Sequence, residues 1–369
     1  MIWILLLSAI SAFAATALSL PTVIRLARRF GFLDQPGPRK SHAIPMPYGG
    51  GIAVAAGCLL TLAGGLAGAW FIEHGTTFGL PPEVTKYARG AVSKAQDLLL
   101  LGGGALVILL LGTVDDRRKL GPRTKLLVET LVATGFVIGS ERLSLFWEGS
   151  FAADLAGGAV TVLWIVGVTN AFNLLDHMDG LTGGVAFLVC LFLAIIAVVT
   201  GQWFVAAALA ALGGAALGFL IFNFPPARVY IGDGGSLFTG FVLSTLTVTF
   251  TFYESGGTRP PWAWAIPLVV LAVPLYDTAS VVITRLRNHR PIFEGDQNHV
   301  AHRLLALGMG PRAAALTVYA MTAMTGLAAI LLLQVNALGA GIVLAQLVLT
   351  FGIIALLDRT GRKRDDRTP

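Results

Sequence analysis

The chain is poor in charge and in cysteine. Only 12% of its 369 residues are Asp, Glu, Lys or Arg, roughly half the share of about 25% that is typical of soluble domains. Its two cysteines, Cys58 and Cys190, each lie inside an apolar run, and they supply neither a disulfide framework nor a zinc site. No serine or cysteine is set up as a nucleophile, and a Walker phosphate-binding loop is absent.

Apolar residues make up 55% of the chain and occur in runs of the length that crosses a bilayer as a helix. The pattern predicts an all-α polytopic membrane protein with about eleven transmembrane helices. One integral-membrane domain is expected over 1–357, followed by a basic tail at 358–369. Because basic residues follow rather than precede the first run, we interpret it as an uncleaved helix. The expected spans lie near 2–24, 50–72, 97–114, 125–140, 156–172, 181–199, 203–222, 237–252, 263–283, 313–334 and 337–357.

The distribution of Lys and Arg predicts the orientation of these spans. Of the 26 basic residues, 21 fall in the tail or in loops after odd-numbered spans. The positive-inside rule therefore places the N-terminus outside and the C-terminus in the cytoplasm. The net charge of +6 is attributed to this topology and to anionic lipid, with no nucleic-acid partner expected. The exceptions are Lys86, Arg89, Lys94, Arg142 and Arg259.

The stretch NAFNLLDHMDGLTGG (170–184) places acids between two apolar runs. Asn170, Asn173, Asp176 and Asp179 recur every three residues, so most share one face if the span continues as a helix through them. Their oxygens suit a hard cation such as Mg²⁺. The alternative is a helix terminus whose Asp and Asn cap backbone groups. Because no Lys or Arg occurs from residue 170 to 201, these acids need a cation, a ligand or a distant partner.

The stretch GTVDDRRKLGPRTKLLVE (112–129) holds two adjacent carboxylates at the end of the third span. Neighbouring side chains diverge, so Asp115 and Asp116 are expected to do different jobs. One would orient or deprotonate a nucleophile, and the other would hold the loop or assist a metal. Lys125 and the nearby arginines supply cations for an anionic substrate. An ordinary positive-inside loop explains the arginines but not the paired acids.

The stretch FNFPPARVYIGDGGS (222–236) joins two spans. The two prolines end the preceding helix. Glycines on both sides of Asp233 allow close approach to a ligand, as in phosphate-binding turns. A plain turn explains Asp233 equally well in isolation, but beside the other acidic loops it is a good second metal ligand.

The longest inner loop, RNHRPIFEGDQNHVAHRLLALG (287–308), carries His299, His302 and Arg303. No further ligands complete a zinc site, so contact with phosphate or pyrophosphate fits better. Asp296 is a candidate to orient one histidine. Asp277, inside the ninth span, is expected to be functional or paired with an arginine such as Arg285. Together the four motifs suit a metal-assisted phosphoryl-type transfer on the cytoplasmic face.

Five motifs resemble those of the polyprenyl-phosphate N-acetylhexosamine-1-phosphate transferases, the undecaprenyl-phosphate branch of glycosyltransferase family 4. They are the four above and DQPGPRKSHAIPMPYGGG (34–51), in family order and spacing. The resemblance implies transfer of a sugar 1-phosphate from a UDP-sugar to undecaprenyl or another polyprenyl phosphate, with release of UMP. It also implies Mg²⁺, with Mn²⁺ as an alternative, and a site at the cytoplasmic side of the inner (plasma) membrane. Membrane lipids are expected partners, and a homodimer is left open.

The resemblance also implies roles for individual residues. Asp115 and Asp116 would serve near the lipid phosphate as the catalytic pair, while Asn173 and Asp233 would bind the metal. The expected substrate-binding residues are Lys40, Lys125, Asn170, Asp176, Asp179, Tyr230, His299, His302 and Arg303. Among them the two acids and the tyrosine would form the nucleotide pocket, and the basic residues would neutralise phosphate charge.

One departure bears on the sugar: His177 stands where family members usually have Gly, so the donor preference is less firmly implied than the reaction. The final motif, HVAHR, resembles the branch that uses UDP-N-acetylglucosamine and lacks the run of histidines typical of the UDP-N-acetylmuramoyl-pentapeptide branch. The sequence therefore favours UDP-N-acetylglucosamine, with UDP-GalNAc and UDP-MurNAc-pentapeptide as alternatives, in an initiating step of envelope polysaccharide synthesis such as O-antigen or teichoic acid.

An ion-coupled transporter is the rival class, but the acids cluster at one boundary and no internal repeat is evident. A catalytically inactive scaffold is disfavoured because every acidic motif position is filled.

Overall fold

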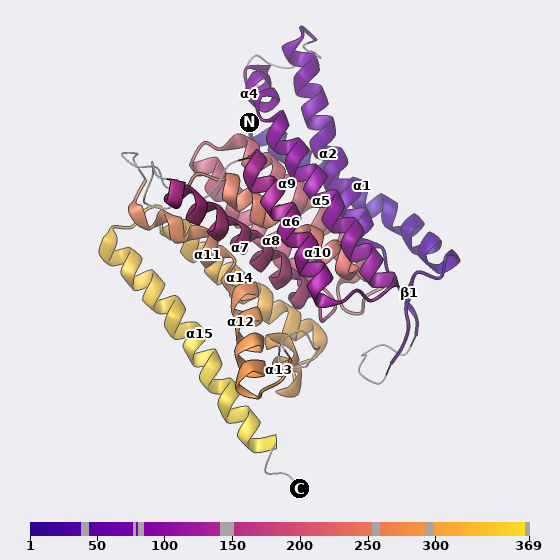
Figure 1. Cartoon of the computed structure of the whole chain (residues 1–369), viewed down its shortest axis with the longest axis vertical. Helices are drawn as coiled ribbons and strands as arrows, with labels where there is room; N and C mark the ends of the chain where they lie inside the picture. The colour runs from indigo at the N-terminus through magenta and orange to yellow at the C-terminus, as the bar shows by residue number, and fades with distance from the viewer. Residues whose placement is uncertain are drawn as a thin grey trace. The chain divides into compact units, whose positions relative to one another are not determined.

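The computed structural model is almost entirely helical and forms two compact units, Met1–Phe250 and Thr251–Pro369 (Figure 1). It describes residues 1–37, 44–76, 79, 85–140, 151–252, 259–291 and 299–365. The all-α membrane fold expected from the sequence is confirmed. The division into a domain over 1–357 and a separate tail stays a prediction, although helix continues through Asp365.

The first unit is a helical bundle with one two-stranded ribbon (Figure 1). Its ribbon pairs β1 (Leu33–Asp34) antiparallel with β2 (Met46–Pro47). Its helices are α1 (Ile2–Arg29), α2 (Gly50–Glu73), α4 (Ala88–Ser93), α5 (Ala95–Arg117), α6 (Pro122–Gly139), α7 (Phe151–Leu175), α8 (Leu181–Val199), α9 (Trp203–Asn223) and α10 (Gly232–Thr249).

Helix α10 is the centre of this unit. It packs against α2, α5 and α7, and every one of its residues except Asp233 is buried. Its buried hydroxyls bond to carbonyls of the same helix, as Thr239 Oγ1 does to Gly235 O at 2.8 Å. Polar side chains are therefore satisfied within the helix. Asp233, the one residue of α10 that is partly exposed, lies in the first turn of this helix.

Glycines bring the neighbouring helices close to the first turn of α10. A Cβ on Gly51 of α2 would lie 2.3 Å from Gly235 Cα, and one on Gly112 of α5 would lie 2.4 Å from Gly234 N. Real Cβ atoms do not approach backbone so closely, so only glycine fits at these positions. Small residues at helix contacts are the usual means of close packing in membrane proteins. The same contacts fix the backbone around Asp233.

The second unit contains one broken helix pair and two long helices. A 3-10 turn (Pro261–Ala265) leads into α11 (Ile266–Val270), and the pair formed with α12 (Ala272–Arg287) is bent by 68°. Helix α14 (Pro311–Leu331) packs against α11 and α12 as well as α13 (Val300–Ala306) and α15 (Ala337–Asp365). The hydrogen bond from Trp262 Nε1 to Leu332 O, 2.9 Å long, ties the start of the broken pair to the end of α14.

Eight helices in the described part of the chain are long and apolar enough to cross a membrane, or nine if the bent pair is one span. Helix occurs at all eleven expected positions, but α6 and α10 do not meet that criterion of length and apolarity. The short connections at 200–203 and 335–338, where the sequence also allows a kink within one helix, both separate two helices. The count of eleven and the orientation stay predictions.

Candidate active site

The ammonium of Lys125 joins two carboxylates from different helices. Its Nζ donates to Asp115 Oδ2 at 2.9 Å and to Asp233 Oδ2 at 2.6 Å. Lys125 lies in the first turn of α6, Asp115 near the end of α5 and Asp233 at the start of α10. The side chains of Lys125 and Asp115 are only 15% and 12% exposed, so water screens this contact weakly. Two sequence motifs thus meet at one cationic centre.

Asp116 faces a different partner from its neighbour. Its Oδ1 accepts a hydrogen bond from Asp233 N at 2.8 Å, and its Oδ2 accepts one from Gly234 N at 3.3 Å. These are free N–H groups of the first turn of α10, and a carboxylate there also complements the helix dipole. The two adjacent aspartates therefore make different contacts, as the sequence predicted, and Asp116 holds the loop that carries Asp233.

The amides of α7 line the same end of the bundle. Asn173 Nδ2 donates to Ser236 Oγ at 3.0 Å, one turn along α10 from Asp233. Asn170 Nδ2 donates to Glu129 Oε2 of α6 and to Val166 O. Because the amide nitrogen of Asn173 is engaged by the serine, its Oδ1 is the atom left to act as a ligand.

The sequence left open whether the helix continues through the acidic stretch or ends within it, and α7 ends within it. The helix ends at Leu175, and turns follow as far as Gly180, whose φ of 81° favours glycine. Asp176 and Asp179 therefore do not share a helical face with the two asparagines. Asp179 Oδ2 instead accepts a hydrogen bond from Ala227 N at 2.9 Å, so it connects this turn to the loop after α9.

Asp176 is surrounded by protein and by other acids. Its Oδ1 accepts a hydrogen bond from Thr182 Oγ1 at 2.8 Å. Burial raises the pKa of the Asp176 carboxyl to about 8, against the lowering effect of Thr182, and the negative charges of Asp233, Asp116 and Asp179 raise it further. The group is therefore mostly protonated at neutral pH.

This raised pKa predicts a pH-dependent stability. A carboxyl whose folded pKa lies above its unfolded value of about 3.9 binds more protons when folded, so its contribution to stability is complete below pH 4 and is lost as pH rises toward 8. In Asp176→Asn the neutral amide removes this loss. We expect the melting temperature of purified protein in detergent to fall less between pH 5 and pH 8 in the variant than in the wild type. Parallel curves for the two proteins would contradict the prediction.

The β-ribbon is tied to the loop before α10. Tyr230 N donates to Pro47 O at 2.9 Å, and Gly50 N donates to Tyr230 O at 3.0 Å. The ring of Tyr230 lies 6.4 Å from that of Tyr48, whose hydroxyl donates to Asp34 Oδ1 at 2.8 Å. The motif at residues 34–51 is thereby joined to the loop that carries Asp233. Lys40 of the same motif lies outside the described residues.

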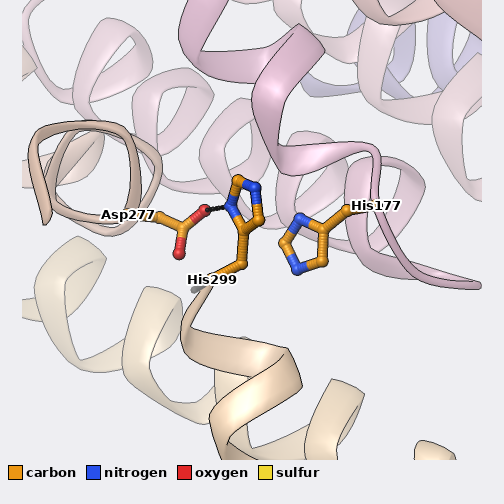
Figure 2. Close-up of side chains that lie close together, drawn as sticks. All are labelled: His177, Asp277 and His299. Carbon is orange, nitrogen blue, oxygen red and sulfur yellow. Dashed lines mark hydrogen bonds and ion pairs between the residues drawn. The ribbon is translucent and has the colours of Figure 1, made fainter. Parts of the chain in front are cut away.

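The second unit holds the remaining predicted residues. His299 Nδ1 lies 2.7 Å from Asp277 Oδ2 (Figure 2). Val300 N donates to Asp277 Oδ1 at 2.7 Å. The sequence did not anticipate this contact between Asp277 and His299. The ring of His302 lies 6.3 Å from that of His299, and Arg303 donates to Ser280 Oγ at 3.2 Å. Asp296, expected to orient a histidine, lies outside the described residues.

Sequence reasoning missed two polar residues of the first unit. Asn223 is buried, accepts a hydrogen bond from Gly180 N at 2.8 Å and donates to Val229 O at 2.9 Å, so it joins two loops of the site. Glu129 is 2% exposed and bonds Asn170. The signal for Glu129 was an acid inside an expected span, a position that usually indicates function or a partner.

These features define a class: an all-α integral membrane protein with carboxylates, amides and a lysine gathered at one end of its first helical unit. The profile of glycosyl transferase family 4 matches residues 98–251, from the first turn of α5 through the end of α10. The chain is 32% identical to the probable undecaprenyl-phosphate N-acetylglucosaminyl 1-phosphate transferase of Bacillus subtilis, over 85% of this chain and 80% of the relative. The chain belongs to glycosyl transferase family 4.

Two further relatives are similar over comparable lengths. The decaprenyl-phosphate N-acetylglucosaminephosphotransferase of Mycobacterium tuberculosis is 27% identical over 93% of this chain and 86% of the relative. The undecaprenyl-phosphate alpha-N-acetylglucosaminyl 1-phosphate transferase of Escherichia coli K12 is 27% identical over 83% of this chain and 77% of the relative. The similarity thus extends well beyond the residues matched by the family profile.

Proposed function

We propose that this protein transfers N-acetylglucosamine 1-phosphate from UDP-N-acetylglucosamine to a polyprenyl phosphate in the membrane and releases UMP. An oxygen of the lipid phosphate attacks the sugar-bearing phosphorus, and the bond between that phosphorus and the oxygen of UMP breaks. The observation that carries the proposal is the convergence of Asp115 and Asp233 on the Lys125 ammonium. The names of the three relatives support the same reaction.

The donor set suits Mg²⁺, or Mn²⁺ in its place. Asp233 and Asn173 would hold the ion through oxygen atoms, the ligands that a hard cation prefers. The arrangement supports this because Asp115 and Asp233 already direct two carboxylate oxygens at one cation. When bound, a divalent cation neutralises charge that develops on the phosphates.

The chain's own residues position the substrates. Lys125 is available to a phosphate oxygen, while Asp116 keeps the first turn of α10 in place. A phosphate monoester is largely a dianion at neutral pH, so Asp115 and Asp116 need only orient the attacking lipid phosphate. We assign Asp176, Asp179 and Tyr230 to the nucleotide, and Lys40, Asn170, His299, His302 and Arg303 to phosphate or sugar contacts. The excess of basic residues in one set of loops supports a plasma membrane protein whose site faces the cytoplasm.

The test is transfer of radiolabel from UDP-[¹⁴C]GlcNAc to undecaprenyl phosphate by purified protein in detergent, with Mg²⁺ or with a chelator. We expect label in the lipid phase and release of UMP only with Mg²⁺. Asp233→Ala should reduce the rate at least about 100-fold, because such a group stabilises charge at the reacting centre. Asp97→Ala is the matched control, since Asp97 lies in the first turn of α5, at the opposite end of that helix from Asp115.

Other outcomes have distinct meanings. Label from a different UDP-sugar would keep the reaction and change the donor. Equal rates for Asp233→Ala and Asp97→Ala would remove the proposed site. No transfer from any nucleotide sugar, by protein that melts cooperatively, would refute the proposed function.

A further inference from the structure

Glu129 is a buried acid with half of its carboxylate unused. It lies on α6 with 2% of its surface exposed, and its Oε2 accepts a hydrogen bond from Asn170 Nδ2. Its Oε1 is also buried, and no donor in the described part of the chain bonds it. A buried polar atom without a partner is costly, and each such atom in a native protein calls for an explanation.

Lys125 is placed to become that partner. It precedes Glu129 by four residues on α6, the spacing at which two helical side chains form an ion pair. Its Nζ is instead held by Asp115 of α5 and Asp233 of α10. The lysine therefore donates to two carboxylates, and a third, that of Glu129, lies within reach along the same helix.

A divalent cation on Asp233 would compete with this lysine. Lys125 Nζ lies 2.6 Å from Asp233 Oδ2, and two cations at one oxygen repel each other strongly where water is scarce. The lysine must leave that oxygen when the metal binds. With Asp233 taken, the ammonium would keep only Asp115 as a partner in a poorly hydrated place, and this loss of one carboxylate would weaken metal binding.

We propose that Glu129 is a positioning residue that receives the Lys125 ammonium when a divalent cation takes the Asp233 carboxylate, with Oε1 accepting the lysine while Oε2 keeps Asn170 in place. This inference rests on the metal site of the proposed function. It explains why an acid with a free oxygen is buried one helical turn from the lysine. One ammonium and one divalent cation then balance the charges of Asp115, Asp233 and Glu129. Lys125 stays at the site, where a phosphate can meet it, instead of being displaced to water.

The experiment measures binding of Mn²⁺ to the full-length protein in detergent by electron paramagnetic resonance, without substrates. Glu129→Gln keeps the shape and an oxygen acceptor for Asn170 but removes the charge, and should weaken Mn²⁺ binding about tenfold, the effect of one lost ion pair. Lys125→Met removes the competing cation and should tighten binding. In the double variant, Glu129→Gln should have no further effect on Mn²⁺ binding, because there is no Lys125 ammonium for Glu129 to accept.

Several results would overturn this inference. Unchanged Mn²⁺ binding in Glu129→Gln would do so while leaving the proposed function intact. Equal weakening with and without Lys125 would make Glu129 a direct metal ligand. Weaker binding in Lys125→Met would show that the lysine does not compete, and this arm remains decisive if Glu129→Gln fails to fold. A wild type that transfers label without binding Mn²⁺ or needing Mg²⁺ would remove both this inference and the proposed metal site, but not the transfer reaction.

Discussion

Replacing Lys125 with methionine should reduce sugar-phosphate transfer at least about 100-fold, the loss expected when a charge that stabilises the reacting centre is removed. It should also lower the melting temperature when divalent cations are chelated. The methionine leaves Asp115 and Asp233 without the ammonium that lies 2.9 Å and 2.6 Å from their oxygens. Breaking a fully buried ion pair costs about 3–5 kcal/mol. The loss should be smaller here, because the Asp233 side chain is 33% exposed.

The response to Mg²⁺ should separate the two effects of this substitution. Because the variant holds two carboxylates with no cation between them, Mg²⁺ should raise its melting temperature more than that of the wild type. Activity should nevertheless stay low, since no lysine remains to meet the phosphates. Lys119→Met is the matched control: Lys119 is exposed in the same connection between α5 and α6. A Lys125→Met protein with wild-type rate and wild-type melting behaviour would show that the bridging ammonium is incidental.

The helices could be predicted from the sequence because their cause is local. Apolar runs of bilayer length form helices wherever water is absent, since backbone groups must be paired within the segment. The short connections near residues 200 and 335 were expected to separate helices, with a kink as the alternative, and both do separate two helices. The sequence did not reveal that α10 is buried on every side, because its many serines and threonines make it look less apolar than its neighbours.

The site was predictable in composition but less so in its contacts. The motifs follow alternate expected spans, and the ends of alternate spans fall on one side of a membrane, so the meeting of Asp115, Lys125 and Asp233 follows from the expected topology. Their pairing depends on tertiary packing, which motif spacing does not encode. The sequence left open whether the acidic stretch continues the preceding helix, because a three-residue spacing of acids and amides does not distinguish a helix from a helix end followed by turns. Glu129 was missed because its meaning depends on Asn170, which is distant in sequence.

The substitution Gly112→Ala tests whether helix packing sets the geometry of the site. A Cβ on Gly112 would lie 2.4 Å from Gly234 N and 2.5 Å from the carbonyl carbon and oxygen of Asp233. These are backbone atoms, so α5 and the first turn of α10 must move apart. Overpacking of this kind costs about 1–3 kcal/mol. The displacement also carries Asp233 away from Lys125, and a shift of about 1 Å at a reacting centre can cost 100-fold in rate. We therefore expect a modest fall in melting temperature and a loss of transfer of about 100-fold.

Gly103→Ala provides the control within the same helix. Gly103 lies in α5, and a Cβ there meets no atom of the described chain within 4 Å. Alanine is the better helix former, by about 1 kcal/mol, so this variant should melt at or above the wild-type temperature and keep its activity. Measuring melting and label transfer for both variants distinguishes a general intolerance of α5 to alanine from a local effect at Asp233. If Gly112→Ala loses stability but transfers at the wild-type rate, the position of the first turn of α10 does not limit the reaction, and Asp233 has a different role from the one proposed.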